Sequence, residues 1–352
     1  MKILLASDAW HPQINGVVRA LSTTVDLLRA RGHSVELITP DLFRTFPCPG
    51  YGEIRLALGC GGEVARRLDA IAADAIHIAT EGPIGWATRR WCLTRERAFT
   101  TSFHTRFPDY LAKRTHFPAD WFWPVMRRFH GPATRIMVAT AALGKELAER
   151  GLSRSHRWPL GVDPAQFNPA VPPLTDMARL PRPVELYVGR VAVEKNIGAF
   201  LECRTPGSKV VVGAGPDHVA LQNRFPAAHF LGALHGERLA SAYTAADVMV
   251  FPSRTDTFGL VTIEALACGV PVAAFPVAGP LDILGADGTG RHGGRGVIGA
   301  VDDDLEAAIL KALCGDPAAC VAEARHYGWE QCTAAFEAGL AVSTPVEPAL
   351  AA

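Results

Sequence analysis

Short apolar segments alternate with helix-like segments twice along this chain, and that alternation restricts its fold more than any other feature. The strand-like runs cover residues 2–7, 34–39, 75–79, 99–104 and 135–139 in the first half, and residues 185–189, 209–213, 247–252 and 270–275 in the second. Buried β runs separated by amphipathic helices are typical of parallel sheets with helices on both faces. The pattern therefore predicts an α/β protein with two Rossmann-like domains whose parallel sheets face each other across a cleft.

Prolines gather between the two halves and mark a linker. The cluster runs from Pro164 to Pro173, and a chain of 352 residues is also too long for one ordinary core. We therefore expect one domain over residues 1–165 and a second over residues 166–326. The Pro/Ala-rich tail over residues 345–352 is expected to fray.

The composition excludes several classes of protein. Hydrophobic residues make up 49% of the chain and charged residues 20%, which excludes intrinsic disorder. No apolar run approaches the roughly 18 residues that a membrane span needs, and the N-terminus lacks a signal-peptide pattern. The eight cysteines form no Cys-x-x-Cys pair, so we expect reduced, buried thiols in a cytoplasmic protein.

The net charge of zero hides an asymmetry between the two halves. Residues 1–165 carry 22 Lys+Arg and 15 Asp+Glu, a balance of +7, whereas residues 166–352 carry 13 and 20, a balance of −7. Two interpretations stay open at this point: compositional drift, or two domains with different partners, the first of which faces an anionic one.

The loop after the first strand lacks the Gly-x-Gly-x-x-Gly fingerprint of dinucleotide enzymes. Asn15 and Gly16 stand there instead, directly before a helix-like segment over residues 17–31. Gly16 removes the side chain where the loop meets a helix N-terminus, so a phosphate could approach the backbone amides. A plain Asn-Gly turn explains the same two residues equally well.

The segment over residues 251–269, FPSRTDTFGLVTIEALACG, is the most informative part of the chain. Its apolar strand runs into a polar loop, after which a helix is predicted from about Phe258 to Gly269. The candidates for the N-cap of this helix are Thr255, Asp256 and Thr257. An anion site is predicted at the helix start, formed by the backbone amides of Phe258, Gly259 and Leu260.

Two carboxylates belong to the same segment. Asp256 precedes the predicted helix and Glu264 lies inside it, so the two would flank a bound phosphate rather than pair with each other. A purely structural interpretation makes Asp256 a cap and Glu264 a solvated helix residue. The apolar neighbours of Glu264 favour burial, where a carboxylate needs hydrogen-bond partners.

This spacing of an acid, seven residues and Glu around Phe-Gly-Leu resembles the signature of family 4 of the retaining glycosyltransferases. Five further short motifs are similar to those of the family and follow its order along nearly the whole chain. They are Gly161-Val-Asp163, Tyr187-Val-Gly-Arg190 with Glu194-Lys195-Asn196, Val212-Gly-Ala-Gly-Pro216, Phe230-Leu-Gly232 and Gly328-Trp329-Glu330.

The resemblance implies the GT-B fold, with a C-terminal helix over residues 327–345 that joins the N-terminal domain. It implies that Arg190 and Lys195 neutralise the diphosphate of the donor, that Asp256 holds sugar hydroxyls and that Glu264 holds the ribose. Asp256 stands where most members have Glu, which is longer by one methylene.

No metal site and no cofactor are expected beyond the nucleotide-sugar co-substrate. The run Asp302-Asp-Asp304 lies at a predicted helix start and is interpreted as capping rather than as a metal clamp. The resemblance further implies that the configuration of the transferred sugar is retained.

His104 is the expected catalytic partner of Asp256. It ends the strand-like run over residues 99–104, and the C-terminal ends of strands in doubly wound sheets are where ligands bind. A lone histidine there is structural about as often as functional, but the resemblance places it at the transferred sugar and its phosphate. Asp8 and Asn15, in a segment similar to that of glycolipid-forming members, are expected on the acceptor side.

The segment over residues 111–130 interleaves basic with aromatic residues. The basic residues are Lys113, Arg114, Arg127 and Arg128, and the large apolar ones are Trp121, Phe122, Trp123, Met126 and Phe129. Such a pattern suits an anionic membrane surface, although a helix pair with an ordinary core face fits it as well. The neighbouring Arg106 and Asp109 are expected to form a local ion pair.

The resulting hypothesis is a bacterial glycosyltransferase that moves a hexose from a UDP-sugar to a membrane lipid such as diacylglycerol, with an α-glycosidic product. It would lie in the cytoplasm, peripheral on the inner face of the plasma membrane, with no nucleic-acid partner. Alternatives are a soluble or polysaccharide acceptor, a sugar-nucleotide epimerase of the same fold, a nicotinamide dehydrogenase or a non-catalytic sugar-nucleotide sensor.

Overall fold

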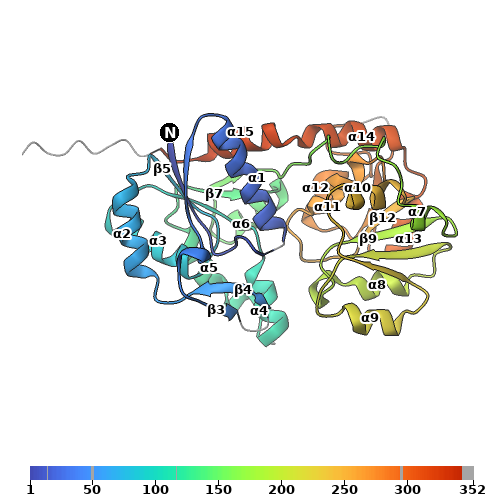
Figure 1. Cartoon of the computed structure of the whole chain (residues 1–352), viewed down its shortest axis with the longest axis horizontal. Coiled ribbons are helices and arrows are strands. Elements are labelled where there is room, and N and C mark those ends of the chain that lie inside the picture. The colour runs from blue at the N-terminus through green and yellow to red at the C-terminus, as the bar shows by residue number, and fades with distance from the viewer. Residues whose placement is uncertain (14, 49–50, 116, 294–295, 343–352) are drawn as a thin grey trace, which may run out of the picture. The chain divides into compact units, whose positions relative to one another are not determined.

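The computed structural model describes residues 1–13, 15–48, 51–115, 117–293 and 296–342 (Figure 1). They form two compact units. The first comprises Met1–Pro159 and the chain from Cys332 onward, and the second is Leu160–Gln331. The chain therefore enters the second unit before the proline cluster. The tail over residues 345–352 lies outside the described residues.

The first unit is built on a six-stranded parallel sheet with the strand order β2-β1-β5-β6-β7-β8. Its strands are β1 (Lys2–Ala6), β2 (Ser34–Ile38), β5 (Ala75–Ile78), β6 (Thr100–Ser102), β7 (Arg135–Val138) and β8 (Ser155–Arg157). An antiparallel hairpin of β3 (Thr45–Cys48) and β4 (Tyr51–Ala57) stands apart from this sheet. The hairpin and β8 were not predicted from the sequence.

Most helices of the first unit connect these strands, whereas the last one begins in the second unit. They are α1 (Gly16–Ala30), α2 (Gly61–Ile71), α3 (Pro83–Thr94), α4 (Phe107–Thr115), α5 (Trp123–His130), α6 (Ala141–Glu149) and α15 (Trp329–Gly339), with 3-10 turns η1 (Pro40–Leu42) and η2 (Ala119–Trp121). Helix α1 ends where the sequence predicted, because Gly32 takes a left-handed φ of 86° directly after its last turn. From Cys332 onward, α15 belongs to this unit.

The sheet of the first unit is covered on both faces, and every residue of β5 is buried as a result. Ile76 and Ile78 are buried in a core shared with α2 and α3, which lie together on one side of the sheet (Figure 1). The intervening His77 points to the other face, where its ring meets Phe336 of α15 at 4.9 Å. Strands buried on both faces are the hallmark of parallel α/β sheets.

The second unit repeats this design. Its parallel sheet has the order β11-β10-β9-β12-β13-β14. The strands are β9 (Val184–Val188), β10 (Ser208–Val212), β11 (His229–Gly232), β12 (Val248–Phe251), β13 (Val272–Ala274) and β14 (Gly299–Val301). Strands β9, β10, β12 and β13 agree with the runs predicted from the sequence to within two residues at each end, whereas β11 and β14 were not predicted. The α/β prediction with two parallel sheets is confirmed.

The helices of the second unit are mostly short. They are α7 (Thr175–Ala178), α8 (Ile197–Glu202), α9 (His218–Arg224), α10 (Gly236–Thr244), α11 (Leu260–Ala267), α12 (Ala278–Leu284), α13 (Leu305–Ala312) and α14 (Pro317–Ala324), with 3-10 turns η3 (Val193–Lys195) and η4 (Arg325–Tyr327). Asp304 caps α13 through bonds from the amides of Glu306 and Ala307, which confirms the capping interpretation of that acidic run.

The direction of strand addition reverses once in each sheet. In the second unit the chain starts at β9, adds β10 and β11 on one side, and then adds β12, β13 and β14 on the other. In the first unit the reversal lies between β1 and β5. In open α/β sheets, ligands bind outside the carboxyl ends of the strands at such a reversal. Each unit therefore has one favoured place for a site.

Candidate active site

Lys195 and Asp256 meet at the reversal point of the second unit. Lys195 ends η3, which follows β9, and Asp256 lies in the loop between β12 and α11. The Lys195 Nζ lies 2.5 Å from the Asp256 Oδ1, although the residues are 61 positions apart. Both side chains stay about one-fifth exposed to solvent. The structure thus brings together a predicted phosphate ligand and the predicted sugar ligand.

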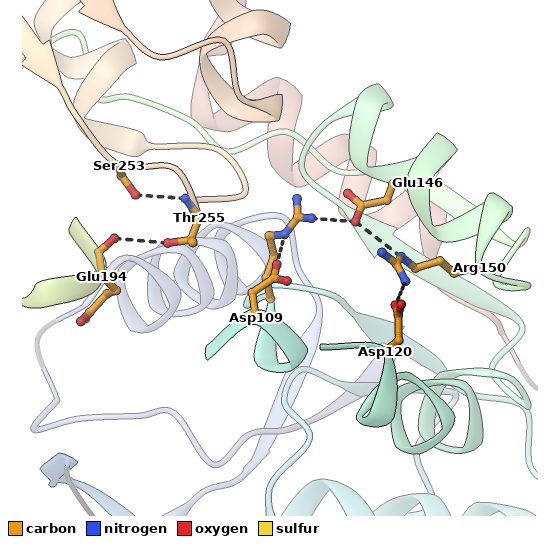
Figure 2. A network of polar contacts seen from close by, with 8 residues as sticks. Asp109, Asp120, Glu146, Arg150, Glu194, Ser253 and Thr255 are labelled. Carbon is orange, nitrogen blue, oxygen red and sulfur yellow. Dashed lines mark hydrogen bonds and ion pairs between the residues drawn. The ribbon is translucent and has the colours of Figure 1, made fainter. Parts of the chain in front are cut away.

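Two hydrogen bonds, one buried and one partly buried, tie together the loops that carry this ion pair. The Asn196 side-chain amide donates to the Pro252 carbonyl at 3.1 Å, and the Thr255 hydroxyl donates to the Glu194 carbonyl at 3.3 Å. The Thr255 backbone amide in turn donates to the Ser253 hydroxyl at 3.4 Å (Figure 2). The backbone frame of the site is therefore fixed independently of the ion pair.

Arg190 lies beside the same frame, with its guanidinium 3.8 Å from the carboxylate of the buried Glu194. The predicted glycine loop packs directly against the Arg190 segment. A Cβ on Gly213 would lie 1.8 Å from the Gly189 carbonyl oxygen, and one on Gly215 would lie 2.1 Å from the Val191 carbonyl oxygen. These glycines are therefore required to bring two backbone segments together at the reversal point.

The start of α11 differs from the prediction. The helix begins at Leu260 rather than Phe258, its N-cap is Gly259 with a φ of 89°, and no side chain caps it. The proposed capping by Thr255, Asp256 or Thr257 is therefore wrong. Asp256 does not cap the helix because its carboxylate is bound to Lys195. The cap position is a glycine because a Cβ at Gly259 would lie 2.9 Å from the Phe251 ring.

Phe258 and Leu260 flank this glycine cap, and both are buried. The Phe258 ring packs against Tyr327 with a centroid distance of 6.1 Å. A contribution of Phe258 to an anion site would therefore come from its backbone amide, as the sequence indicated, because its side chain belongs to the core.

Glu264 is buried in α11, and its Oε2 accepts a hydrogen bond of 2.9 Å from the hydroxyl of Tyr243 in α10. This agrees with the expectation that a carboxylate in such apolar surroundings needs partners. Tyr243 was missed because nothing in the sequence links α10 to α11. A buried charged hydrogen bond of this kind fixes the carboxylate before any ligand arrives.

In the first unit, the predicted acceptor-side residue Asp8 caps α3. Its carboxylate accepts from the backbone amides of Ile84 and Gly85 at 2.9 and 3.2 Å and from the Thr80 hydroxyl at 3.1 Å. Burial raises the pKa of Asp8 to about 6, against the lowering effect of these bonds. Gly82 is required beside it, since a Cβ there would lie 2.3 Å from the Asp8 carboxyl carbon.

Asn15 and Gly16 form the start of α1. The Asn15 side chain accepts a hydrogen bond of 3.0 Å from the Val18 amide and is the N-cap of the helix, while Gly16 is its exposed first residue. The structure thus assigns Asn15 a capping bond, and it leaves the start of α1 at the edge where β1 ends.

His104 follows β6 and is half-buried. Its ring meets the buried Trp158 edge-on at 5.4 Å, and Trp158 also packs on Phe336. Desolvation of the imidazole and the charge of His130 lower the pKa of His104 to about 4. The His104 imidazole is therefore neutral at physiological pH.

Two further histidines lie behind His104. His77 is fully buried between the hydroxyls of Thr100 and Ser102, at 2.9 and 2.7 Å, and burial lowers its pKa to about 3. His130, also buried, lies 2.9 Å from the Thr101 hydroxyl and 3.2 Å from the carboxylate of Glu81, which follows β5. Glu81 was not among the site residues predicted from the sequence.

Arg106 and Asp109 form the expected ion pair, with 2.5 Å between Nε and Oδ2. Arg106 also reaches Glu146 at 2.7 Å, and Arg150 joins Glu146 to Asp120 (Figure 2). This network ties α4, η2 and α6 together, and Arg106 therefore has a structural role in it.

The described side chains of the segment over residues 111–130 divide between core and surface; those of Lys113 and Arg114 lie outside the description. Trp123, Met126 and Phe129 are buried, and Trp123 stacks on Phe103 at 6.0 Å. The membrane-surface interpretation is therefore wrong for Trp123, which belongs to the core as the helix-pair interpretation expects. Trp121 is 66% exposed and stacks on Phe117, which is 51% exposed.

Neither a metal cluster nor a spanning helix occurs in the described part of the chain. No group of three or more His, Cys, Asp or Glu side chains among the described residues has the geometry to hold a metal ion. None of the described helices is both long and apolar enough to cross a bilayer.

Curated relatives of this chain are glycosyltransferases. It is 29% identical to the sulfoquinovosyl transferase SQD2 of Arabidopsis thaliana over 80% of its length, a match that spans 60% of that protein. It is 30% identical to a GDP-mannose-dependent alpha-mannosyltransferase of Mycolicibacterium smegmatis, over 93% of this chain and 91% of the other. It is 26% identical to the alpha-monoglucosyldiacylglycerol synthase of Acholeplasma laidlawii, over 77% of this chain and 79% of the other.

Structural similarity and family models agree with these relatives. A sucrose-phosphate synthase from Thermosynechococcus elongatus superposes with a TM-score of 0.71 at 21% identity, covering 96% of this chain and 97% of that one. The model "Glycosyltransferase Family 4" matches residues 14–166, and the model "Glycosyl transferases group 1" matches residues 182–314. The two matches carry the site residues of both units, apart from Asp8. The chain is therefore a transferase of the GT-B fold and belongs to glycosyltransferase family 4.

Proposed function

We propose that this protein transfers a hexose from a UDP-sugar to a membrane lipid such as diacylglycerol and retains the α configuration. The observation that carries the donor part is the placement of Arg190 and Lys195 at the strand reversal of the second unit, beside Asp256. Two cations at such a point fit a ligand with two neighbouring phosphates.

The chemistry requires stabilisation of the charge that develops on the leaving diphosphate. Arg190 and Lys195 supply fixed positive charge, and the amides at the start of α11 add the positive end of a helix dipole. In this proposal no divalent metal is needed. The departing phosphate oxygen accepts the proton of the acceptor hydroxyl on the face of the sugar that it leaves.

The remaining polar residues divide the donor between them. Asp256 accepts hydrogen bonds from sugar hydroxyls, and Glu264, held by Tyr243, accepts them from the ribose. His104 is neutral because its pKa is about 4, so it contacts the sugar without opposing a positively charged transition state. Asp8 and Asn15 then shape the acceptor side through the helix starts that they cap.

The lipid acceptor is supported by three exposed apolar side chains close together in the sequence: Phe117 after α4, Trp121 in η2 and Val125 in α5. These side chains are 51%, 66% and 47% exposed. Arg127 and Arg128 are exposed on the next turn of α5. An apolar surface beside cations suits insertion into an anionic interface. The name of the Acholeplasma relative also includes a diacylglycerol product.

Product analysis tests the whole proposal. The purified protein is incubated with UDP-, GDP- and ADP-hexoses together with diacylglycerol in vesicles, in excess chelator, and the products are identified by mass spectrometry. We expect a hexosyl lipid from a UDP-sugar and full activity without divalent metal. Transfer only from a GDP-sugar would contradict the proposed UDP-sugar donor. Transfer only to soluble acceptors would contradict the proposed lipid acceptor. Release of an epimerised sugar nucleotide without transfer would contradict it.

Vesicle co-sedimentation tests the membrane part separately. Replacing Phe117 and Trp121 with Ala should weaken binding to anionic vesicles, because each exposed ring inserts apolar area and adjacent basic residues contribute about 1 kcal/mol each. Leu93→Ala removes a comparably exposed side chain from α3 and should have no effect. Binding of wild type should also weaken as salt rises. Equal binding of all three proteins, or none at any salt, argues for a soluble acceptor.

A further inference from the structure

We propose that the ion pair of Lys195 and Asp256 is a latch that the donor diphosphate opens. The inference rests on the proposed function, and it adds an order of events to it. Lys195 is held by Asp256 until a diphosphate takes the ammonium, and only then does the Asp256 carboxylate become available to sugar hydroxyls. The latch therefore links recognition of the diphosphate to recognition of the sugar.

The ammonium of Lys195 and the carboxylate of Asp256 are in direct contact. The two charged atoms lie 2.5 Å apart, so the ammonium and the carboxylate are in direct hydrogen-bonding contact with no water between them. A carboxylate so engaged presents one oxygen less to a sugar hydroxyl. An ammonium so engaged is partly neutralised as a phosphate ligand.

The surroundings allow the pair to open without moving the loops. The hydrogen bonds from Asn196 to Pro252 and from Thr255 to Glu194 involve a backbone carbonyl in each case, and Thr255 and Glu194 are buried. The Lys195 and Asp256 side chains are 22% and 19% exposed. A ligand from solvent can therefore reach the ion pair more easily than the hydrogen bond between Thr255 and Glu194. A lysine side chain can turn about its four-carbon stem while the backbone frame stays in place.

The energetics favour exchange of partners. An ion pair that is partly open to solvent contributes little net stability, whereas a diphosphate offers more negative charge than one carboxylate. The shorter Asp side chain at position 256, where Glu is usual in the family, still reaches Lys195.

A double-mutant cycle with UDP as the probe tests the latch. Affinities are measured by calorimetry for wild type, Asp256→Asn, Lys195→Met and the double variant. Asp256→Asn should tighten UDP binding about two- to fivefold, the scale of a partly exposed ion pair, and should lower turnover. The tightening should be larger when Lys195 is present than in the Lys195→Met background, because only the former includes release of the ammonium.

Two controls separate the latch from a simple change of net charge. Asp256→Glu keeps the charge and should not tighten UDP binding. Asp176→Asn removes one exposed carboxylate from α7 of the same unit and should leave UDP affinity unchanged. Thermal unfolding of each variant establishes that it is folded.

The outcomes are distinct. Tightening that is equal or smaller in the presence of Lys195 overturns the latch, as does weaker UDP binding by Asp256→Asn. If wild type binds neither UDP nor inorganic pyrophosphate, both the latch and the proposed donor site are wrong.

Discussion

The polar residues at the strand reversals make different kinds of contact in the two units, although both units are built on a six-stranded parallel sheet. In the second unit, Lys195, Asp256 and Arg190 form partly exposed charge contacts at the strand reversal. In the first unit, Asp8 and Asn15 cap helices and His104 is neutral. The site of the second unit thus suits an anionic ligand, and that of the first suits uncharged hydroxyl groups.

This contrast runs against the charge balance of the sequence. The basic half of the chain contains the site with the neutral histidine, and the acidic half contains the candidate phosphate site. Net charge is a property of the whole surface, whereas a phosphate site needs two cations in one place. The expectation that the first domain faces an anion therefore concerns its surface, where Arg127 and Arg128 are exposed, and not its strand reversal.

The largest effect is expected from removing a cation of the second unit. Arg190→Ala should lower kcat/KM by about 10²–10³-fold and weaken UDP binding. The reason is that the protein loses one fixed positive charge that stabilises the leaving diphosphate. Arg224→Ala, which removes an exposed arginine from the same unit, is the control and should leave both unchanged. If His104→Ala weakens UDP binding as much as Arg190→Ala does, the assignment of UDP binding to the second unit alone is wrong.

A smaller effect is expected at the buried carboxylate of the second unit. Glu264→Gln should weaken UDP binding by about 1–3 kcal/mol, the range for a lost hydrogen bond to a charged group. Tyr243→Phe removes only the hydroxyl that holds Glu264 and should cost about 0.5–1.5 kcal/mol in the same titration. An unchanged UDP affinity in Glu264→Gln would remove the ribose assignment.

The matching change in the first unit should affect stability instead of binding. Asp8→Ala leaves the Ile84 and Gly85 amides without their acceptor and should lower the free energy of unfolding by about 1–3 kcal/mol. Asp8→Asn retains an acceptor oxygen and should lose less. UDP affinity, measured on the folded protein by calorimetry, should not change in either variant. A stable Asp8→Ala protein would contradict the capping role.

Acid should weaken the first unit through its buried histidine. The pKa of His77 is about 3 in the folded protein against an ordinary 6.5, so the neutral form is favoured by folding. Its contribution is complete above pH 6.5 and is lost as pH falls towards 3, at about 1.4 kcal/mol per pH unit. Urea unfolding at several pH values should therefore show a shallower pH slope for His77→Gln than for wild type.

Asp8 acts with the opposite sign in part of this range. Its raised pKa means that its contribution is lost as pH rises from 3.8 through about 6. Because Asp8 is present in both proteins, its effect cancels in the comparison of wild type with His77→Gln. Equal slopes would show that His77 is not buried in its neutral form.

Local patterns in the sequence predicted much of the fold because they act over few residues. Runs of apolar residues marked most central strands, and Gly32 marked the end of α1. The hairpin of β3 and β4 and the strand β8 were missed because they lack a long apolar run. The start of α11 was misplaced because the cap is a glycine packed on Phe251 and no side chain caps the helix.

The site was predicted as a set of residues but not as a set of contacts. The motifs identified Lys195, Asp256 and Glu264, whereas the pairing of Lys195 with Asp256 and of Glu264 with Tyr243 depends on which loops and helices become neighbours. Likewise, the aromatic content of residues 111–130 could not tell the buried Trp123 from the exposed Trp121. That distinction depends on Phe103, which directly follows β6 and stacks on the Trp123 ring.

Hydrogen exchange on adding UDP tests the central claim most directly, because it reports where the donor nucleotide binds without assuming an acceptor. We predict slower exchange of the amides over residues 189–196 and 257–262, the segments that carry Arg190, Lys195 and the start of α11. Leu93 and its neighbours in α3 should exchange as in the free protein. Protection confined to other segments, with none over residues 189–196, would contradict the assignment of the diphosphate site to the second unit.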